Sequence, residues 1–262
     1  MNKRALVTGS SSGIGKHLSE ELAKKGYALI LVARREENLK ELAEKIRHEF
    51  HTACEYYVCD LSHEAEVESL IKTYPDVDVL INNAGFGMYG FFHEMPWSRT
   101  RELIGVNVLS PVRLAHHYLP GMIKRGGGKI LNVASVAGMR ATPYFSSYCG
   151  AKAFMIQFSK SLALEVNDEN VHVCCLLPGT TATEFWQISG MQEKVSQRIG
   201  GFDDPRETAV FGINQMEKGM ISGVPGLKNK VKELMKNILP EQMWFYLIKR
   251  HMTHPSLFAK RK

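Results

Sequence analysis

Six short apolar runs recur along the chain, and each ends in small or polar residues before a helical segment begins. Such alternation indicates a parallel sheet with helices over both faces, because strands that are buried on both sides read as nearly continuous apolar runs. The runs lie at residues 4–7, 28–32, 56–59, 77–81, 129–133 and 171–177. No linker or repeat divides them in the sequence, so we predict one α/β domain with a doubly wound parallel sheet.

The first apolar run stops at a glycine-rich turn, which a helical pattern follows. A strand, a glycine turn and a helix together offer backbone N–H groups and a helix N-terminus to a pyrophosphate. The turn reads Thr8-Gly9-Ser10-Ser11-Ser12-Gly13-Ile14-Gly15, with the spacing Gly-x-x-x-Gly-x-Gly rather than Gly-x-Gly-x-x-Gly. A purely structural turn is the alternative, but the flanking strand and helix favour a nucleotide-binding loop.

The second run ends at Ala33-Arg34-Arg35. An NAD-binding fold carries an acidic residue here, which holds the ribose hydroxyls. Two guanidinium groups suit a ribose 2′-phosphate instead, by charge and by geometry. We therefore predict NADP(H) as the cofactor, with Arg34 favoured over Arg35. The alternative is that both arginines simply begin the charged helix at residues 36–49.

Tyr148 and Lys152 are four residues apart, so at the start of a helix their side chains share one face. A phenol beside an ammonium group in a partly dry pocket has its ionised form favoured. Such a pair can move a proton to and from a carbonyl/alcohol couple. Alone, the spacing is common by chance, and a solvated helix turn is the alternative.

Polar clusters follow four later runs, just beyond the expected carboxyl ends of the strands, where such sheets bind ligands. They are Asp60-Leu61, Asn82-Asn83-Ala84-Gly85, Ala134-Ser135 and Pro178-Gly179.

The ordered set of these motifs resembles the short-chain dehydrogenase/reductase family over approximately residues 1–225. It comprises Thr8-Gly9-x-x-x-Gly13-Ile14-Gly15, Asp60, Asn82-Asn83-Ala84-Gly85, Asn107, Ser135, Tyr148-x-x-x-Lys152 and Pro178-Gly179. The resemblance implies a single-domain Rossmann-type fold. It also implies an NADP(H)-dependent oxidoreductase that interconverts a ketone and a secondary alcohol by hydride transfer.

The resemblance implies four catalytic roles. Tyr148 would exchange the proton with the substrate oxygen, and Lys152 would favour the phenolate and hold the nicotinamide ribose. Ser135 would donate a hydrogen bond to the carbonyl oxygen, and Asn107 would anchor a water in the proton relay. A non-catalytic NADP(H)-binding redox sensor is the alternative function, which the retained tyrosine and lysine disfavour.

The resemblance also implies a set of cofactor contacts. Ser11 would assist at the 2′-phosphate, Asp60 would contact the adenine ring, and Thr181 and Thr183 would clamp the nicotinamide carboxamide. The whole set is Gly9, Ser11, Ser12, Gly13, Ile14, Gly15, Arg34, Arg35, Asp60, Leu61, Asn83, Ala84, Gly85, Tyr148, Lys152, Pro178, Gly179, Thr181 and Thr183.

By family position, residues 184–191 would form a lid over an apolar substrate such as a steroid or a fatty-acyl ketone. The alternative is that half of these side chains pack in the core. The predicted lid and pocket residues are Glu184, Phe185, Trp186, Ile188, Met191, Phe86, Met88, Tyr89, Met139 and Tyr144.

The C-terminal part departs from the compact family members and resembles the extension of a DltE-like branch. We predict a catalytic domain at residues 1–226 and an extension at residues 227–262, packed on the domain, on a partner subunit or over the active-site mouth. The run 243–248, flanked by Lys249 and Arg250, also has the composition of a membrane-interface helix. We favour packing of the extension over contact with a membrane.

The five cysteines form neither a disulfide framework nor a metal-like set, which favours a reducing, cytoplasmic compartment. We predict no metal site, and a packing role rather than a redox role for Cys149. The formal net charge of +6 is modest, and it indicates a solvent-exposed charged surface rather than a nucleic-acid site. The resemblance implies a homodimer or homotetramer formed through the helices that carry Asn107 and Tyr148.

Overall fold

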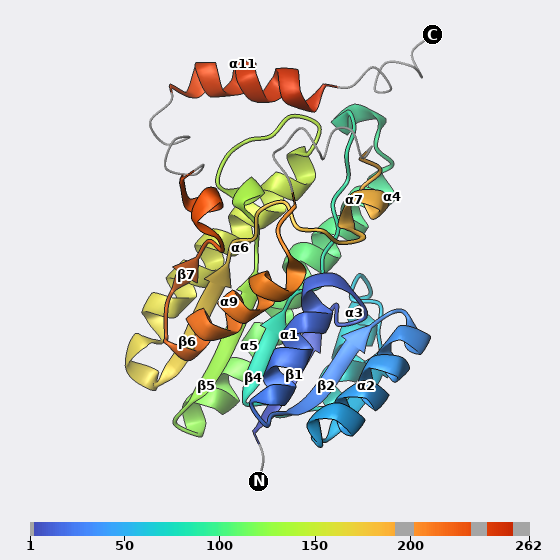
Figure 1. Ribbon diagram of the computed structural model, residues 1–262, viewed down its shortest axis with the longest axis vertical. Helices are drawn as coiled ribbons and strands as arrows, with labels where there is room; N and C mark the ends of the chain where they lie inside the picture. The colour runs from blue at the N-terminus through green and yellow to red at the C-terminus, as the bar shows by residue number, and fades with distance from the viewer. Residues whose placement is uncertain (1–2, 192–201, 232–239, 254–262) are drawn as a thin grey trace.

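A seven-stranded parallel sheet forms the centre of the protein, whose computed structural model describes residues 3–191, 202–231 and 240–253. The strand order is β3-β2-β1-β4-β5-β6-β7 (Figure 1). The strands are β1 (Arg4–Thr8), β2 (Ala28–Ala33), β3 (Cys54–Val58), β4 (Val79–Asn82), β5 (Gly128–Val133), β6 (Val171–Leu176) and β7 (Ser222–Gly223).

Helices cover both faces of this sheet. One face carries α1 (Gly13–Lys24), α2 (Glu36–Phe50) and α9 (Pro205–Glu217), and the other carries α3 (Glu64–Thr73), α5 (Ser110–Lys124) and α6 (Ser146–Glu165). Neighbouring strand residues face opposite sides, as the pleat requires.

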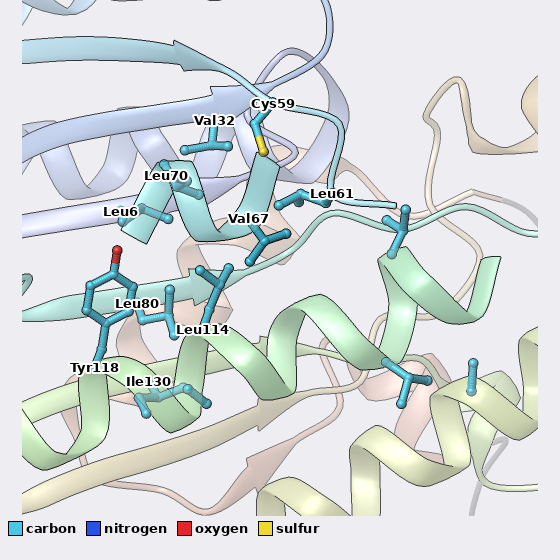
Figure 2. Close-up of a cluster of buried hydrophobic side chains, with 14 of the residues drawn as sticks. Leu6, Val32, Cys59, Leu61, Val67, Leu70, Leu80, Leu114, Tyr118 and Ile130 are labelled. Carbon is cyan, nitrogen blue, oxygen red and sulfur yellow. The ribbon is translucent and has the colours of Figure 1, made fainter. Parts of the chain in front are cut away.

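Within β1, Ala5 and Val7 pack against the first set of helices, whereas Leu6 packs against the second. Figure 2 shows the second cluster, in which Leu6 and Leu80 from the strands lie beside Leu114 and Tyr118 from α5. Burial on both faces accounts for the apolar character of the runs.

The predicted fold class is confirmed. All six apolar runs form strands, displaced from the predicted bounds by at most two residues at either end. Strand β7 was not predicted, because it has only two residues and no apolar run. It forms because Ser222 and Gly223 pair with Cys175 and Leu176 of β6.

The sheet reverses its strand order between β1 and β4, which lie side by side although α1, β2, α2, β3 and α3 separate them in sequence. A crevice forms at such a switch point beyond the carboxyl ends of the strands. The remaining short elements gather beyond this edge. They are η1 (Phe92–Glu94), α4 (Trp97–Ile104), η2 (Gly105–Leu109), η3 (Val136–Gly138), α7 (Phe185–Ile188) and α11 (Glu241–Met252), with η4 (Asn167–Glu169) preceding β6.

All five cysteines are free, as predicted from their number and spacing, and all five are buried. None of the helices among the described residues combines the length and the apolar character that crossing a bilayer demands. The predicted boundary at residue 226 and the DltE-like character of the extension stay predictions.

A buried polar chain joins β4, β5 and α6. The Asn82 Nδ2 donates to Asn132 Oδ1 at 2.9 Å, and the Asn132 Nδ2 donates to Ser159 Oγ at 2.9 Å. The three side chains are at most 5% exposed, so water cannot replace these partners. Removing one member leaves the others unsatisfied, which costs more than the net value of a hydrogen bond.

We expect Asn132→Ala to lower the free energy of unfolding by about 2–4 kcal/mol, measured by urea denaturation. Asn167→Ala, at an exposed position, serves as the matched control and should stay within about 0.5 kcal/mol of the wild type. Equal stability of the two variants would contradict the proposed role of the buried chain.

Candidate active site

A cavity of about 730 Å³ lies beyond the carboxyl ends of the strands. Its lining includes side chains or backbone from the glycine turn, from the ends of β2 to β6, from the lid and from α11. All the predicted site residues line it except Gly15 and Asn107. The structure therefore brings together residues that the sequence distributes from Gly9 to Thr183.

The glycine turn approaches the loop after β4 to backbone contact. Gly9 has a φ of +66°, and a Cβ on it would lie 2.8 Å from the Ala84 Cα. A Cβ on Gly15 would lie 2.2 Å from the Gly9 oxygen and 2.4 Å from Asn83 Nδ2. Gly15 thus allows close packing beneath the loop, and its role as a cofactor contact stays a prediction.

Thr8 and Asn83 hold these two loops together, a role that sequence reasoning did not assign to Thr8. The Thr8 Oγ1 accepts hydrogen bonds from the backbone N–H groups of Asn83 and Ala84 at 3.0 and 3.1 Å. The Asn83 Nδ2 donates to the carbonyl oxygens of Thr8 and Gly9 at 2.9 and 3.1 Å. Hydrogen bonds between these two loops therefore hold the predicted site at the switch point in place without a ligand.

Two arginines stand at the end of β2, beside the glycine turn. The Arg35 guanidinium donates to Ser11 Oγ at 3.2 Å and forms an ion pair with Glu184 at 2.8 Å. The Arg34 Nη1 lies 3.6 Å from Asp60 Oδ2. Burial acts to raise the pKa of Asp60, but hydrogen bonds from the following loop and the Arg34 charge outweigh it, so this pKa is lowered. Asp60 is therefore ionised at neutral pH.

Tyr148 is buried at the start of α6, with its ring 5.1 Å from the Phe185 ring of the lid, between centroids. Burial raises the pKa of Tyr148, and a hydrogen bond with Ser135 opposes this shift without reversing it. The Ser135 Oγ also accepts the backbone N–H of Ala137 at 3.1 Å, which fixes its position after β5. At neutral pH the phenol is consequently a proton donor.

Lys152 is also buried, one helical turn after Tyr148. Its Nζ donates to the Val133 oxygen at 2.8 Å and lies 5.8 Å from the centroid of the Tyr148 ring. Burial lowers the pKa of Lys152 to about 8, because the charged form is desolvated. The shared helix face is confirmed. The expected lowering of the tyrosine pKa is wrong for this structure, since burial dominates at both groups.

Asn107 lies in a π-helical turn, Gly105–Leu109, between α4 and α5. Such turns often occur at functional sites. The Asn107 Nδ2 donates to the oxygens of Phe86 and Leu103, each at 3.0 Å. The buried Asn107 Oδ1 has no hydrogen-bond partner among the described residues and faces Gly85, where a Cβ would approach it to 2.6 Å. An unsatisfied oxygen of this kind fits the predicted water anchor.

The lid begins against the glycine turn. A Cβ on Gly13 would lie 2.9 Å from Thr183 Cγ2, so the two segments touch. The Trp186 Nε1 donates to the Thr181 oxygen at 2.9 Å, which fixes α7 over the cavity. Glu184 and its neighbours line the cavity as predicted; they are Phe185, Trp186, Ile188 and Met191.

Helix α11 lies beyond the carboxyl ends of the strands (Figure 1), and it contributes to the wall of the cavity. Trp244, Leu247, Ile248 and Met252 line it, so the structure supports packing over the active-site mouth among the predicted alternatives. Contact of α11 with a membrane surface stays a prediction. Sequence reasoning placed these side chains in an extension but gave no signal that they face the cavity.

Four of the predicted pocket residues do not line the cavity. Met88 packs against the core, and Met139 lies in a neighbouring hollow. Tyr89 and Tyr144 instead hold the end of α11, because the Tyr89 hydroxyl donates to the Met252 oxygen and the Tyr144 hydroxyl lies 3.3 Å from Thr253 Oγ1. These side chains thus correct the predicted pocket. Phe86 alone of the five upstream residues lines it.

Arg140, which the sequence did not single out, also lines the cavity. Its guanidinium carbon lies 5.9 Å from the centroid of the Trp244 ring, at the distance of a cation–π contact. It therefore connects the loop after β5 with α11.

Cys149 lines the cavity beside Tyr148, and burial raises the pKa of its thiol. The thiolate that redox chemistry requires is therefore disfavoured, in agreement with a packing role. Among the described residues, no group of three histidine, cysteine, aspartate or glutamate side chains could hold a metal ion.

Comparison with known proteins agrees with the family resemblance of the sequence motifs. The sequence profile of the short chain dehydrogenase family matches residues 3–194. Hydroxysteroid dehydrogenase-like protein 1 is 31% identical in Gallus gallus, over 92% of this chain and 73% of that protein. Its Homo sapiens counterpart, named inactive, is 28% identical over 92% of this chain and 74% of that protein.

Very-long-chain 3-oxoacyl-CoA reductase of Rattus norvegicus is 35% identical over 70% of this chain, which spans only 61% of that protein. Among solved structures, a short-chain dehydrogenase from Sphingobium yanoikuyae in complex with NADPH has a TM-score of 0.81 and 29% identity. The match covers 90% of this chain and 94% of that chain.

The doubly wound sheet, with its cavity at the switch point, thus places the chain among oxidoreductases of Rossmann type. The chain belongs to the short-chain dehydrogenase/reductase family.

Replacing Lys152 with methionine tests the burial of its charge. The pKa of Lys152 is about 8 in the folded protein and 10.5 ordinarily, so the unfolded state binds more protons between these values. The contribution of Lys152 to stability therefore rises with pH across this window. We expect the wild-type free energy of unfolding, minus that of Lys152→Met, to rise by about 1–3 kcal/mol from pH 7 to 10.5.

Urea denaturation at both pH values measures this difference. Tyrosine and cysteine titrations occur in both proteins and cancel to first order. The control is Lys124→Met, at an exposed position near the end of α5, for which the difference should stay flat. A flat difference for Lys152→Met as well would contradict the buried charge.

Proposed function

We propose that this protein is an NADP(H)-dependent oxidoreductase that interconverts a ketone and a secondary alcohol, with Tyr148 as general acid and base. One observation carries the proposal. Ser135, Tyr148 and Lys152 line the same cavity as the glycine turn and the two arginines at the end of β2. A proton donor and a dinucleotide site therefore open into one space.

The residues at one end of the cavity fit a dinucleotide phosphate. Gly9 and Gly13 adopt positive φ angles, and a side chain on either would fill the space beside the turn. The helix α1 begins at Gly13, so its positive N-terminal end points toward bound phosphate. Arg34 and Arg35 would hold the 2′-phosphate, with Ser11 beside Arg35. The structural neighbour in complex with NADPH supports this choice of cofactor.

The bound cofactor supplies the hydride, and the protein handles the proton. The raised pKa keeps the Tyr148 phenol protonated, so it can donate to the oxygen of a carbonyl substrate. The Ser135 hydroxyl can donate a second hydrogen bond to the same oxygen and stabilise the charge that develops there. Lys152 would hold the cofactor ribose, and the unsatisfied Asn107 Oδ1 would bind a water that delivers protons.

The substrate end of the cavity favours an apolar molecule, for which we propose a steroid or a fatty-acyl ketone. The walls there come from the lid and α11, and the aromatic rings of Phe185, Trp186 and Trp244 dominate them. The names of two relatives, a hydroxysteroid dehydrogenase-like protein and a very-long-chain 3-oxoacyl-CoA reductase, support both substrate classes.

A non-catalytic NADP(H)-binding module is the second candidate, because the human relative is named inactive. The retained serine, tyrosine and lysine favour an enzyme over that module.

We also propose a homo-oligomer formed through the helices near Asn107 and on α6, where Leu109, Phe154 and Leu164 are exposed. The cytoplasmic location stays a prediction.

Tyr148→Phe should lower turnover by about 10²–10⁴-fold, because it removes only the transferable proton. A screen of steroid ketones, 3-oxoacyl thioesters and small aldehydes, followed by the loss of NADPH absorbance, finds the substrate for this assay. NADPH affinity should be retained in the variant. The matched control is Tyr57→Phe on β3, whose hydroxyl lies 2.8 Å from Ser69 Oγ outside the cavity and whose turnover should persist. Full activity in Tyr148→Phe would refute the mechanism.

Arg34→Ala and Arg35→Ala test the choice of cofactor. Each should weaken NADPH binding by about tenfold or more while leaving NADH binding nearly unchanged, because only NADPH carries the 2′-phosphate. Fluorescence titration measures both affinities, with Lys40→Ala on the exposed face of α2 as the control. Equal affinity of the wild type for NADPH and NADH would contradict the proposal.

A further inference from the structure

A second hollow lies next to the active-site cavity and shares lining residues with it. This hollow, of about 650 Å³, lies between the loop at residues 138–143, the first half of α6 and α11. We call it the α11 groove. Arg140, Thr142, Cys149 and Ile248 line both spaces, so the two meet along these four residues.

The α11 groove starts beside the catalytic tyrosine. Cys149 follows Tyr148 directly and belongs to both spaces, while Gly150 and Ala153 carry the groove along the next turn of α6. A substrate with its carbonyl at Tyr148 can therefore extend along α6 beneath α11. This path leads away from the glycine turn, which contributes no residue to the groove.

The walls of the α11 groove suit an unbranched apolar chain. Small residues, among them Gly138, Gly150 and Ala153, leave room along the loop and α6. Met139, Phe245 and Ile248 supply the larger apolar surface. Among the described residues no carboxylate lines the groove, and Arg140 and Lys249 are its charged side chains. Methionine and phenylalanine side chains adapt to a flexible methylene chain.

A rigid ring system fits this path less well than a chain does. The passage is bounded by the loop, by α6 and by α11 at once, and α11 is held in place by Tyr89 and Tyr144. A methylene chain rotates about every bond and can adapt to these walls, whereas a polycyclic substrate keeps one shape.

We infer that the protein acts on long-chain ketones, whose alkyl tail leaves the active-site cavity past Ile248 and occupies the α11 groove. This inference rests on the proposed oxidoreductase function and chooses the fatty-acyl type of substrate over the steroid type.

Gly150 allows the groove to be blocked without touching the catalytic residues. A Cβ on Gly150 would meet no atom within 4 Å, and its φ is not in the left-handed region. A leucine side chain at this position begins in open space beside the groove that Gly150 lines, and leucine also favours the helix more than glycine does. Gly150→Ala adds only one methyl group and is the matched control.

The first measurement compares kcat/KM for 2-octanone, 2-hexadecanone and a steroid ketone, with NADPH. For the wild type and Gly150→Ala we expect the longer alkanone to be preferred. Gly150→Leu should lower kcat/KM for 2-hexadecanone by about fourfold for each methylene displaced from the groove, and leave that for 2-octanone unchanged. An unchanged preference for the longer chain in Gly150→Leu, or a wild type that prefers the steroid ketone, would overturn the inference.

The second measurement is independent of turnover. Binding of 2-hexadecanone can be followed by tryptophan fluorescence, because Trp186 and Trp244 line the cavity. Gly150→Leu should weaken this binding at least tenfold relative to Gly150→Ala, and equal affinities would overturn the inference. If no ketone is reduced, the proposed function fails, and the binding comparison still decides whether the groove takes the chain.

Discussion

The close approach of two loops at the switch point governs the whole site. Gly15 packs against the Gly9 oxygen and the Asn83 side chain with no space for a Cβ. Asn83 and Thr8 then bond the loop after β1 to the loop after β4 in both directions. Because β1 and β4 are neighbours in the sheet but far apart in sequence, this contact joins the two halves of the fold. A methyl group at Gly15 would separate the loops and disturb every side chain positioned beyond them.

Burial also shifts the pKa values of two side chains at the opposite end of the cavity. It disfavours the charged form of both Tyr148 and Lys152, so their pKa values move toward the neutral state of each group. A pKa of about 8 leaves Lys152 mostly protonated at pH 7, and its Nζ donates a hydrogen bond to the Val133 oxygen at 2.8 Å. Its position on α6 therefore matters as much as its charge, and the phenol is held ready to give a proton.

The sequence predicts the sheet and most of the site because both depend on local patterns. Apolar runs and the polar residues that follow them are local features, and the parallel topology brings their ends together without further information. The role of Gly15, by contrast, depends on atoms of Asn83, a residue 68 positions away. Tyr89 and Tyr144 resembled pocket residues by composition, yet their hydroxyls are bonded to the end of α11. Neither the packing of Gly15 nor the bonding of Tyr89 and Tyr144 leaves a pattern in the neighbouring sequence.

The position of α11 also separates substrate choice from chemistry. The residues that we propose for proton transfer lie at the end of β5 and the start of α6, which the core holds in place. The roof of the cavity comes instead from a helix near the end of the chain, attached through Tyr89, Tyr144 and the contact between Arg140 and Trp244. Substitutions on α11 can therefore reshape the substrate end while the catalytic geometry persists. In a family whose chemistry is shared, such a separable roof is a physical route by which related chains acquire different substrates.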